Sequence, residues 1–225
     1  RFVTGLGKKV LLLDADPQAN ATSGMGVDKT VSNGIYDVLI NSVETEKAIV
    51  RTSYGDVLPS SKALAGASVE MIDLPERQFR LRMALEQVRD NYDYVFIDFP
   101  PSLELLTLNA LCAADSLLVP LQGEYYALEG LSDLMNTVRL VRRSLNPKLE
   151  IEGVLLTMFD GRTNLAMQVA EEVKHYFPGK VYATVIPRNV RLSEAPSHGK
   201  PVIAYDKWSK GAEAYRALAK EVLEG

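Results

Sequence analysis

Short apolar runs alternate with longer segments of helical periodicity along this chain, and this alternation constrains the fold more than any other feature. The runs have the length and composition of buried strands in a parallel sheet. The predicted strands are Val10–Leu13, Val57–Leu58, Tyr94–Ile97, Leu117–Val119, Ile151–Thr157 and Val181–Ile186. The predicted helices are Glu76–Arg89, Leu128–Leu145, Leu165–Tyr176 and Tyr215–Val222. The pattern predicts an α/β fold, a mostly parallel sheet with helices on both faces.

Acidic residues follow two of these predicted strands. Asp14 and Asp16 come at the end of the first strand, and Asp98 closes the third. In parallel sheets the loops after strand C-termini line one edge, where ligands bind. An apolar run closing on aspartate is the Walker B pattern, whose carboxylate supports Mg²⁺ through its water shell. One such aspartate is more often a helix cap, but two at neighbouring strand ends favour a metal–phosphate site.

Composition limits the class of protein. The 225 residues are 47% apolar and 24% charged, which suits a single α/β domain over residues 1–225. The lone Cys112 cannot form an internal disulfide, so a reduced, cytoplasmic setting is expected. The net charge is −4, yet residues 162–225 carry 10 Lys/Arg against 7 Asp/Glu. This local excess of positive charge is compatible with a polyanion partner, although a chance distribution of charged residues along the chain explains it equally well.

Four motifs occur in order along the chain, at Asp14–Gly24, Asp98–Ser102, Glu124–Gly130 and Val185–Ser197. They resemble motifs of the ParA/Soj family, in the chromosomal Soj branch of the MinD/ParA superfamily. By this resemblance, Asp14–Gly24 corresponds to the switch I segment and Asp98–Ser102 to the Walker B motif and switch II. Together the motifs span nearly the whole chain. The resemblance implies a P-loop NTPase-like fold that uses ATP, ADP and Mg²⁺.

The chain departs from the family at its beginning. Family members open with a strand and a phosphate-binding Walker A loop, Lys-Gly-Gly-x-Gly-Lys-Thr, whereas Arg1–Lys9 resembles the end of the helix after that loop. We therefore expect the first strand and the loop to be missing, two strand edges to be exposed, and the chain as it stands to hydrolyse little or no ATP. We interpret this as a truncated sequence, because the remaining residues of the catalytic edge look intact; the alternative is a degenerate paralogue that has lost ATPase activity.

The resemblance also implies roles for residues of the nucleotide site. Asp16 is expected to orient or activate the attacking water, and Asp16 and Asp98 to support Mg²⁺. Pro187 and Asn189 are expected to contact adenine. Taken alone, Pro187 is better read as a simple strand terminator.

Two arginines match family positions that contact DNA without sequence preference. These are Arg162 and Arg191, both in the net-positive part of the chain. Arginine suits this task, because phosphate contacts supply sequence-independent affinity. Arg162 is expected to start a helix. Lys200, Lys207 and Lys210 extend the predicted patch, and the alternative reading is a set of solvated surface cations.

The resemblance implies a molecular switch. ATP binding joins two subunits into a homodimer that binds non-specific double-stranded DNA, and a ParB/Spo0J-type partner stimulates hydrolysis to ADP and phosphate. The expected role is chromosome or plasmid segregation in the cytoplasm, on the nucleoid. A membrane-associated MinD-like ATPase is the alternative, disfavoured because Ala219–Gly225 is short, acidic and lacks bulky aromatics. A non-catalytic binding paralogue is a third reading, and a nitrogenase iron protein is excluded by the single cysteine.

Overall fold

The alternating pattern does form α/β structure in the computed structural model, which describes residues 2–100 and 104–224. The side chains of Phe2, Tyr125 and Tyr126 are not described. The chain divides into two compact units. The first unit comprises residues 3–114 and 194–205, and the second comprises residues 115–193 and 206–224. The expectation of one domain stays a prediction.

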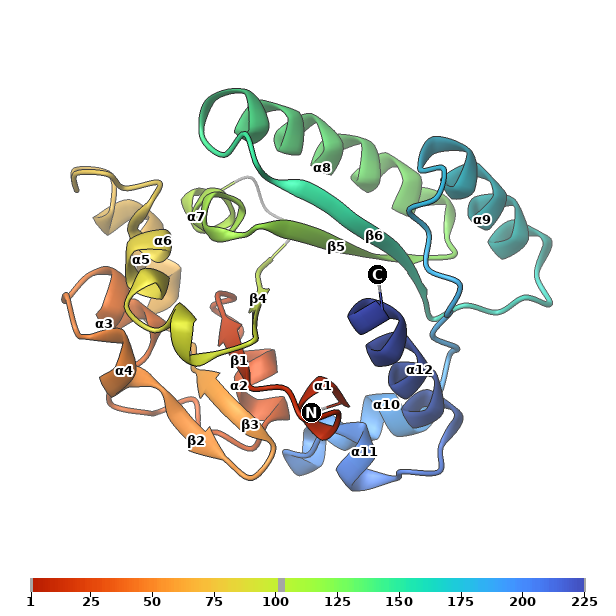
Figure 1. Cartoon of the computed structure of the whole chain (residues 1–225), viewed down its shortest axis with the longest axis horizontal. Coiled ribbons are helices and arrows are strands. Elements are labelled where there is room, and N and C mark those ends of the chain that lie inside the picture. The colour runs from red at the N-terminus through yellow and green to blue at the C-terminus, as the bar shows by residue number, and fades with distance from the viewer. Residues whose placement is uncertain (1, 101–103, 225) are drawn as a thin grey trace. The chain divides into compact units, whose positions relative to one another are not determined.

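The first unit is built on a four-stranded sheet of order β2-β3-β1-β4 (Figure 1). Its strands are β1 (Val10–Asp14), β2 (Val50–Thr52), β3 (Gly55–Leu58) and β4 (Tyr94–Asp98). Strand β1 pairs in parallel with β3 and β4, and only the β2–β3 hairpin is antiparallel. The predicted mostly parallel sheet is thereby confirmed.

One apolar core holds this unit together. Leu11 and Leu13, which share one face of β1, are fully buried, whereas Leu12 on the other face is only half-buried. The helices that contribute to this core are α3 (Ile35–Leu39), α4 (Thr45–Ala48), α5 (Leu64–Glu70), α6 (Arg80–Glu86) and α7 (Leu105–Ala113). The unit also contains α2 (Asn20–Gly24), η1 (Arg89–Asn91), η2 (Ala195–His198) and α11 (Val202–Tyr205), and α1 spans Phe2–Gly5. Helix α2 packs against η2, which comes from far along the chain.

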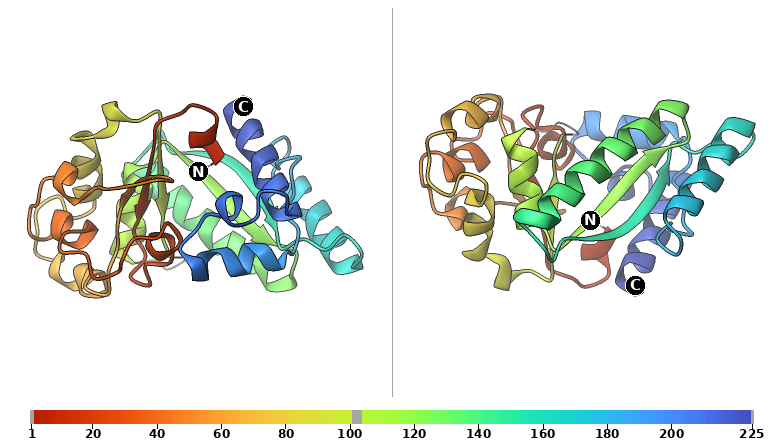
Figure 2. Two further views of the ribbon diagram at one scale, coloured as in Figure 1. Left: turned by 90° about the horizontal axis from the view of Figure 1, so that it is seen from below. Right: turned by 90° about the horizontal axis from the view of Figure 1, so that it is seen from above.

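The second unit is built on two parallel strands, β5 (Ser116–Gln122) and β6 (Glu150–Thr157). Its helices are α8 (Tyr125–Ser144), α9 (Asn164–Tyr176), α10 (Val190–Glu194) and α12 (Lys210–Glu224). Leu117, Val119 and Leu121 are buried on one face of β5. On the other face, Leu118 packs with Leu218 of α12. Helices α8 and α12 therefore cover opposite faces of the strand pair (Figures 1 and 2).

Both sheets end in an apolar strand. Within the described residues, β4 and β5 each hydrogen-bond to a strand on one side only. Phe96 of β4 is 37% exposed, which is high for an aromatic residue on an apolar strand. The sequence-based expectation that a missing strand leaves two strand edges exposed stays a prediction. Among the described helices, none is long and apolar enough to cross a membrane.

Two predicted elements are wrong in type or extent. No strand forms over Val181–Ile186, although both ends of the segment hydrogen-bond to β6. Its central N–H groups, on Ala183 and Thr184, instead donate to the Glu221 carboxylate at 2.6 and 3.0 Å. The helix predicted from Glu76 starts only with α6, because Glu76 has a left-handed backbone with φ of 51°.

Candidate functional site

Three carboxylates meet at one edge of the first sheet. Asp14 and Asp98 are paired positions at the C-terminal ends of β1 and β4, and the Ala15 N–H donates to the Asp98 carbonyl at 2.7 Å. Burial first, and then the charges of Asp14 and Asp16, raise the pKa of Asp98 to about 6. Asp98 remains accessible to solvent, so its carboxyl can still be reached by a ligand. The structure thus brings Asp16 and Asp98 together, as their positions after neighbouring strands predicted.

Asp14 has a structural role, unlike the accessible Asp98. It is fully buried, and its carboxylate accepts hydrogen bonds from Asp16 N at 3.1 Å, Thr22 N at 2.7 Å and Thr22 Oγ1 at 2.7 Å. Thr22 Oγ1 in turn accepts from the buried Ser60 N–H at 2.9 Å. Asp14 therefore fixes the loop that carries Asp16. The sequence did not separate the two acids, since both simply follow an apolar run.

The loop after β1 is a tight, strained turn. Asp16 Oδ1 accepts from Gln18 N at 2.9 Å, and Ala19 N donates to the Asp16 carbonyl at 2.9 Å. Ala19 has a left-handed backbone with φ of 53°, a conformation that costs a non-glycine residue about 1–3 kcal/mol. Such strain persists where the surroundings impose it. Here Asp14 and Thr22 impose it and so set the position of Asp16.

The donor set fits a hydrated, phosphate-bound cation. Among the residues that the structure describes, no group of three or more His, Cys, Asp or Glu side chains is placed to hold a metal ion by itself. Mg²⁺ in nucleotide sites takes one or two carboxylates and fills its octahedron with water and phosphate oxygens. Asp98 and Asp16 can supply that minimal set, and the raised pKa of Asp98 shows negative charge that a cation would neutralise. Pro101 and Ser102, the last residues of the predicted Walker B and switch II motif, lie outside the described residues.

Pro187 and Asn189 belong to the second unit. Phe159, just after β6, bridges to Pro187, and its N–H donates to the Ile186 carbonyl at 3.0 Å. Asn189 Oδ1 accepts from Arg191 N at 3.0 Å and so turns the chain into α10. The loop is flanked by the exposed apolar side chains of Val185, 37% accessible, and Val190, 69% accessible.

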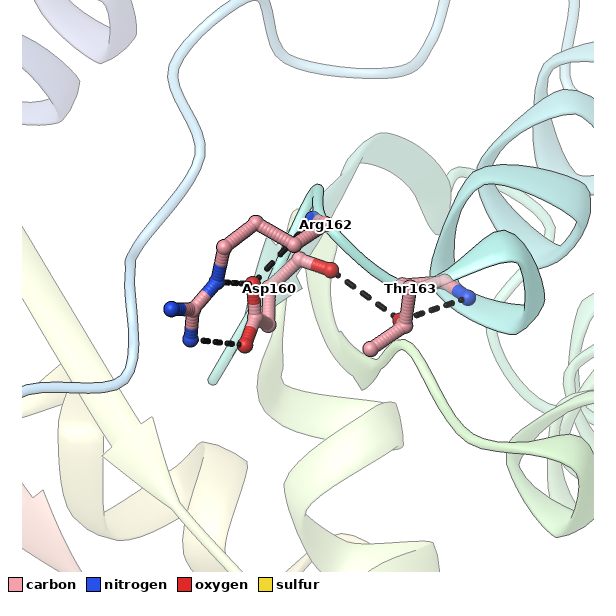
Figure 3. Close-up of polar contacts among 4 residues, drawn as sticks. Asp160, Arg162 and Thr163 are labelled. Atoms are coloured by element: carbon pink, nitrogen blue, oxygen red, sulfur yellow. Dashed lines mark hydrogen bonds and ion pairs between the residues drawn. The ribbon is translucent and has the colours of Figure 1, made fainter.

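Arg162 is highly exposed and paired with an acid (Figure 3). Its side chain is 90% accessible, yet Nε and Nη2 donate to the two carboxylate oxygens of Asp160 at 2.8 and 2.6 Å. These hydrogen bonds lower the pKa of Asp160 to about 2. Thr163, not Arg162, caps α9, because its Oγ1 accepts from Ala166 N at 3.3 Å. Arg162 therefore precedes the helix that it was expected to start.

Arg191 is held by a separate acid. Its Nε lies 3.4 Å from Asp206 Oδ2, with the two side chains 50% and 34% accessible. A third arginine was missed in the sequence. Arg188 lies 3.8 Å from Glu124 and also contributes to the lowered pKa of Asp160. Arg188 is therefore close to the Asp160–Arg162 pair, a proximity that follows from the bridge between Phe159 and Pro187 and has no local sequence signal.

Comparison with known proteins gives consistent matches. A family model for an AAA domain matches residues 2–151. The sporulation initiation inhibitor protein Soj of Bacillus subtilis is 60% identical over 220 residues, covering 96% of this chain and 87% of that protein. The chromosome-partitioning ATPase Soj of Treponema pallidum is 46% identical over 219 residues, covering 96% and 86%. The crystal structure of cobyrinic acid a,c-diamide synthase from Mycobacterium smegmatis, with bound ATP analog and magnesium, has a TM-score of 0.88 at 36% identity, covering 99% and 85%.

Proposed function

Because this chain belongs to the Soj/ParA family of chromosome-partitioning ATPases, we propose that it acts as an ATP-driven switch in chromosome partitioning. The observation that carries the proposal is the carboxylate cluster at the ends of β1 and β4. Asp98 is accessible there and its pKa is raised by burial and by Asp14 and Asp16. The Mg²⁺ ion of a bound nucleotide would bring positive charge to these carboxylates, and its water shell would hydrogen-bond to them.

The proposed chemistry is hydrolysis of ATP to ADP and phosphate. Mg²⁺, when bound, neutralises charge on the phosphates. Asp98 holds the hydrated cation in place, and Asp16 orients the attacking water. Asp14 keeps Asp16 in position through the Asp16 N–H and through Thr22. Because phosphoryl transfer depends mostly on positioning and electrostatics, fixing this loop is part of the proposed mechanism.

The loop around Pro187 and Asn189 is the proposed adenine contact. The exposed side chains of Val185 and Val190 offer apolar surface beside the Asn189 amide. A flat heteroaromatic ring with polar edges suits that combination. The support is local chemistry within the second unit together with the family match.

Non-specific DNA is the proposed macromolecular partner, through Arg162 and Arg191. Both guanidinium groups are at least half accessible and are paired with acids that hold their orientation. A phosphate approaching Arg162 competes with Asp160, so each contact alone is weak. Pairing two subunits through bound ATP doubles the contacts and multiplies affinity. A ParB/Spo0J-type protein is the proposed activator of hydrolysis, and the nucleoid is the proposed location.

The catalytic proposal is tested by Asp16→Ala. We expect hydrolysis to fall about 100-fold or more, ATP binding to persist, and a nucleotide-bound dimer to accumulate in light-scattering measurements. Asp28→Ala, at an exposed aspartate beyond α2, is the matched control and should hydrolyse ATP like the parent. Parental hydrolysis by Asp16→Ala would show that the switch I assignment is wrong.

The DNA proposal is tested by charge reversal. Arg162→Glu and Arg191→Glu should each abolish gel retardation of duplex DNA at physiological salt while leaving ATP binding intact. Arg142→Glu on α8 is the control, because Arg142 is exposed near the end of that helix and outside the proposed patch. Unchanged retardation by both test variants would refute the assignment.

A further inference from the structure

An exposed tryptophan stands out in the second unit. Trp208 is 75% accessible, and it is the only tryptophan in the chain. Tryptophan usually hides most of its surface, since its ring is the largest apolar group among the side chains. The Lys207 Nζ lies 5.0 Å from the centre of the ring. The ring therefore offers apolar surface in a charged setting.

The turn that carries Trp208 is well fixed. Asp206 Oδ1 accepts from Trp208 N at 3.2 Å, and the Asp206 carbonyl accepts from Ser209 Oγ at 2.9 Å. Ser209 is buried and its Oγ accepts from Ala212 N at 3.2 Å, which caps the first turn of α12. Trp208 is thus presented from a rigid base, so little conformational entropy is lost when it meets a partner.

Positive charge gathers around the ring. Arg191 reaches the same turn through Asp206, whose Oδ2 lies 3.4 Å from Arg191 Nε. Arg216 Nη2 donates to the Lys207 carbonyl at 3.3 Å. We name this surface the Trp208 patch, and its members are Arg191, Lys207, Trp208, Lys210 and Arg216. The acids on the same turn and on the first turn of α12 are Asp206 and Glu213, so cations outnumber acids and an anionic partner is favoured.

We propose that the Trp208 patch is a second nucleic-acid contact, in which the cations bind phosphates and the indole ring packs against a base or a deoxyribose of duplex DNA. The proposal rests on the DNA binding proposed above and adds Trp208 to it. Basic side chains around an aromatic ring bind nucleic acids without sequence preference, because phosphates and ring faces are present at every step. In a duplex, apolar side chains reach the minor groove and wedge against base steps.

The position of Arg191 strengthens the inference. Asp206 binds Arg191 with one carboxylate oxygen and the Trp208 backbone with the other. A DNA phosphate drawn to Arg191 therefore arrives within the turn that presents the ring. A lipid surface also attracts tryptophan and lysine, but here Lys207 lies beside the ring and two guanidinium groups, of Arg191 and Arg216, reach the same turn, which favours a phosphodiester backbone.

The single tryptophan makes the first test direct. Its emission should be quenched or shifted as mixed-sequence duplex DNA is added with Mg-ATP, and the change should saturate with the binding curve from gel retardation. Vesicles containing anionic phosphatidylserine should leave the emission unchanged. Unaltered emission while DNA is bound, or a response to vesicles and none to DNA, would overturn the proposal.

Variants give the second test. Trp208→Ala should weaken DNA binding at least about fivefold with an unchanged salt slope, because a ring contact releases no counterions. Trp208→Phe should recover much of the loss, whereas Lys207→Ala should reduce the salt slope by about one. Tyr176→Ala, at another exposed aromatic of the second unit that is 66% accessible, is the matched control and should bind like the parent.

The outcomes separate this inference from the proposed function. If the parent protein and Trp208→Ala bind DNA equally well, the ring contact is refuted and the proposed DNA binding stands. If the parent retains no DNA under any condition, both the ring contact and the proposed DNA binding are refuted. Loss of binding in Trp208→Ala with parental ATP affinity and parental thermal stability supports the ring contact.

Discussion

Replacing Thr22 by valine tests the proposal that a buried hydrogen-bond chain sets the position of Asp16. The threonine hydroxyl donates to Asp14 Oδ2 at 2.7 Å and accepts from Ser60 N at 2.9 Å. Thr22, Asp14 and Ser60 are all fully buried, so water cannot replace the lost partners. Valine keeps the shape of the side chain but removes both hydrogen bonds.

The expected cost follows from these two contacts. Loss of a hydrogen bond to a charged carboxylate costs about 1.5–3 kcal/mol, and a buried N–H left without an acceptor costs about 1–3 kcal/mol. Because Asp14 keeps the N–H groups of Asp16 and Thr22, we expect Thr22→Val to lower the free energy of unfolding of the first unit by about 3–5 kcal/mol. Thr22→Ser keeps the hydroxyl and loses one methyl group, for about 1 kcal/mol.

Urea denaturation followed by far-UV circular dichroism measures the difference. Fluorescence is unsuitable, because Trp208 reports on the second unit. With a slope of about 2 kcal/mol/M, Thr22→Val should lie roughly 1–2 M below Thr22→Ser at the midpoint. Hydrogen exchange at the Ser60 amide should speed up in parallel. A valine variant within about 1 kcal/mol of the serine variant would refute the inferred chain.

Three further perturbations test other features. Burial and like charges raise the pKa of Asp98 from 3.8 to about 6, so between these pH values the folded state holds the proton and the unfolded state has lost it. Without metal, the free energy of unfolding should therefore fall as pH rises through that interval. Asp98→Asn should flatten the plot of urea midpoint against pH, and a plot parallel to the parent's would contradict this. Gly34→Ala places a Cβ 2.7 Å from the Pro59 carbonyl oxygen and should cost about 2 kcal/mol or more, whereas Gly130→Ala, with no heavy atom within 4 Å, should not lower the melting temperature. Burial acts to raise the pKa of Glu221, but its hydrogen bonds outweigh burial and lower the pKa, so the stabilisation that it gives is present above pH 4.5 and is lost as pH falls below. Glu221→Gln should speed hydrogen exchange at the Ala183 and Thr184 amides. Unaltered protection of these two amides would count against their hydrogen bonds to Glu221.

The sequence predicted the long apolar strands correctly but failed at a short strand and at an irregular segment. The strands around Leu11, Phe96 and Leu155 were predictable, because continuous apolar runs are typical of strands in parallel sheets. Strand β2 was not predicted, since Val50–Thr52 is only three residues long and contains an arginine. The missing strand at Val181–Ile186 shows the opposite failure, because its apolar pattern is strand-like and a carboxylate more than thirty residues away takes its N–H groups.

At the candidate site, residue types were predictable and partners were not. The placement of Asp16 and Asp98 at one edge followed from parallel strand order alone. The burial of Asp14 depends on Thr22 and on Ser60, a contact across 38 residues that no local pattern encodes. The ion pair of Arg162 with Asp160 could have been predicted, because the two residues are only two positions apart in a loop. The ion pair of Arg191 with Asp206 could not be predicted without the fold, because the two residues lie far apart in the sequence.

In the second unit, helix α12 holds the segment that connects the proposed adenine contact to the proposed DNA contact. The Glu221 carboxylate fixes the chain before Pro187, and Gly211 leaves room for Leu192 after it, since a Cβ there would lie 2.6 Å from the leucine Cγ. Within this clamped segment, the Asn189 side chain accepts from Arg191 N at 3.0 Å. A nucleotide that engages Asn189 therefore acts on the backbone that carries Arg191. Linkage is reciprocal, so DNA that selects one position of Arg191 must change ATP affinity by the same factor that ATP changes DNA affinity.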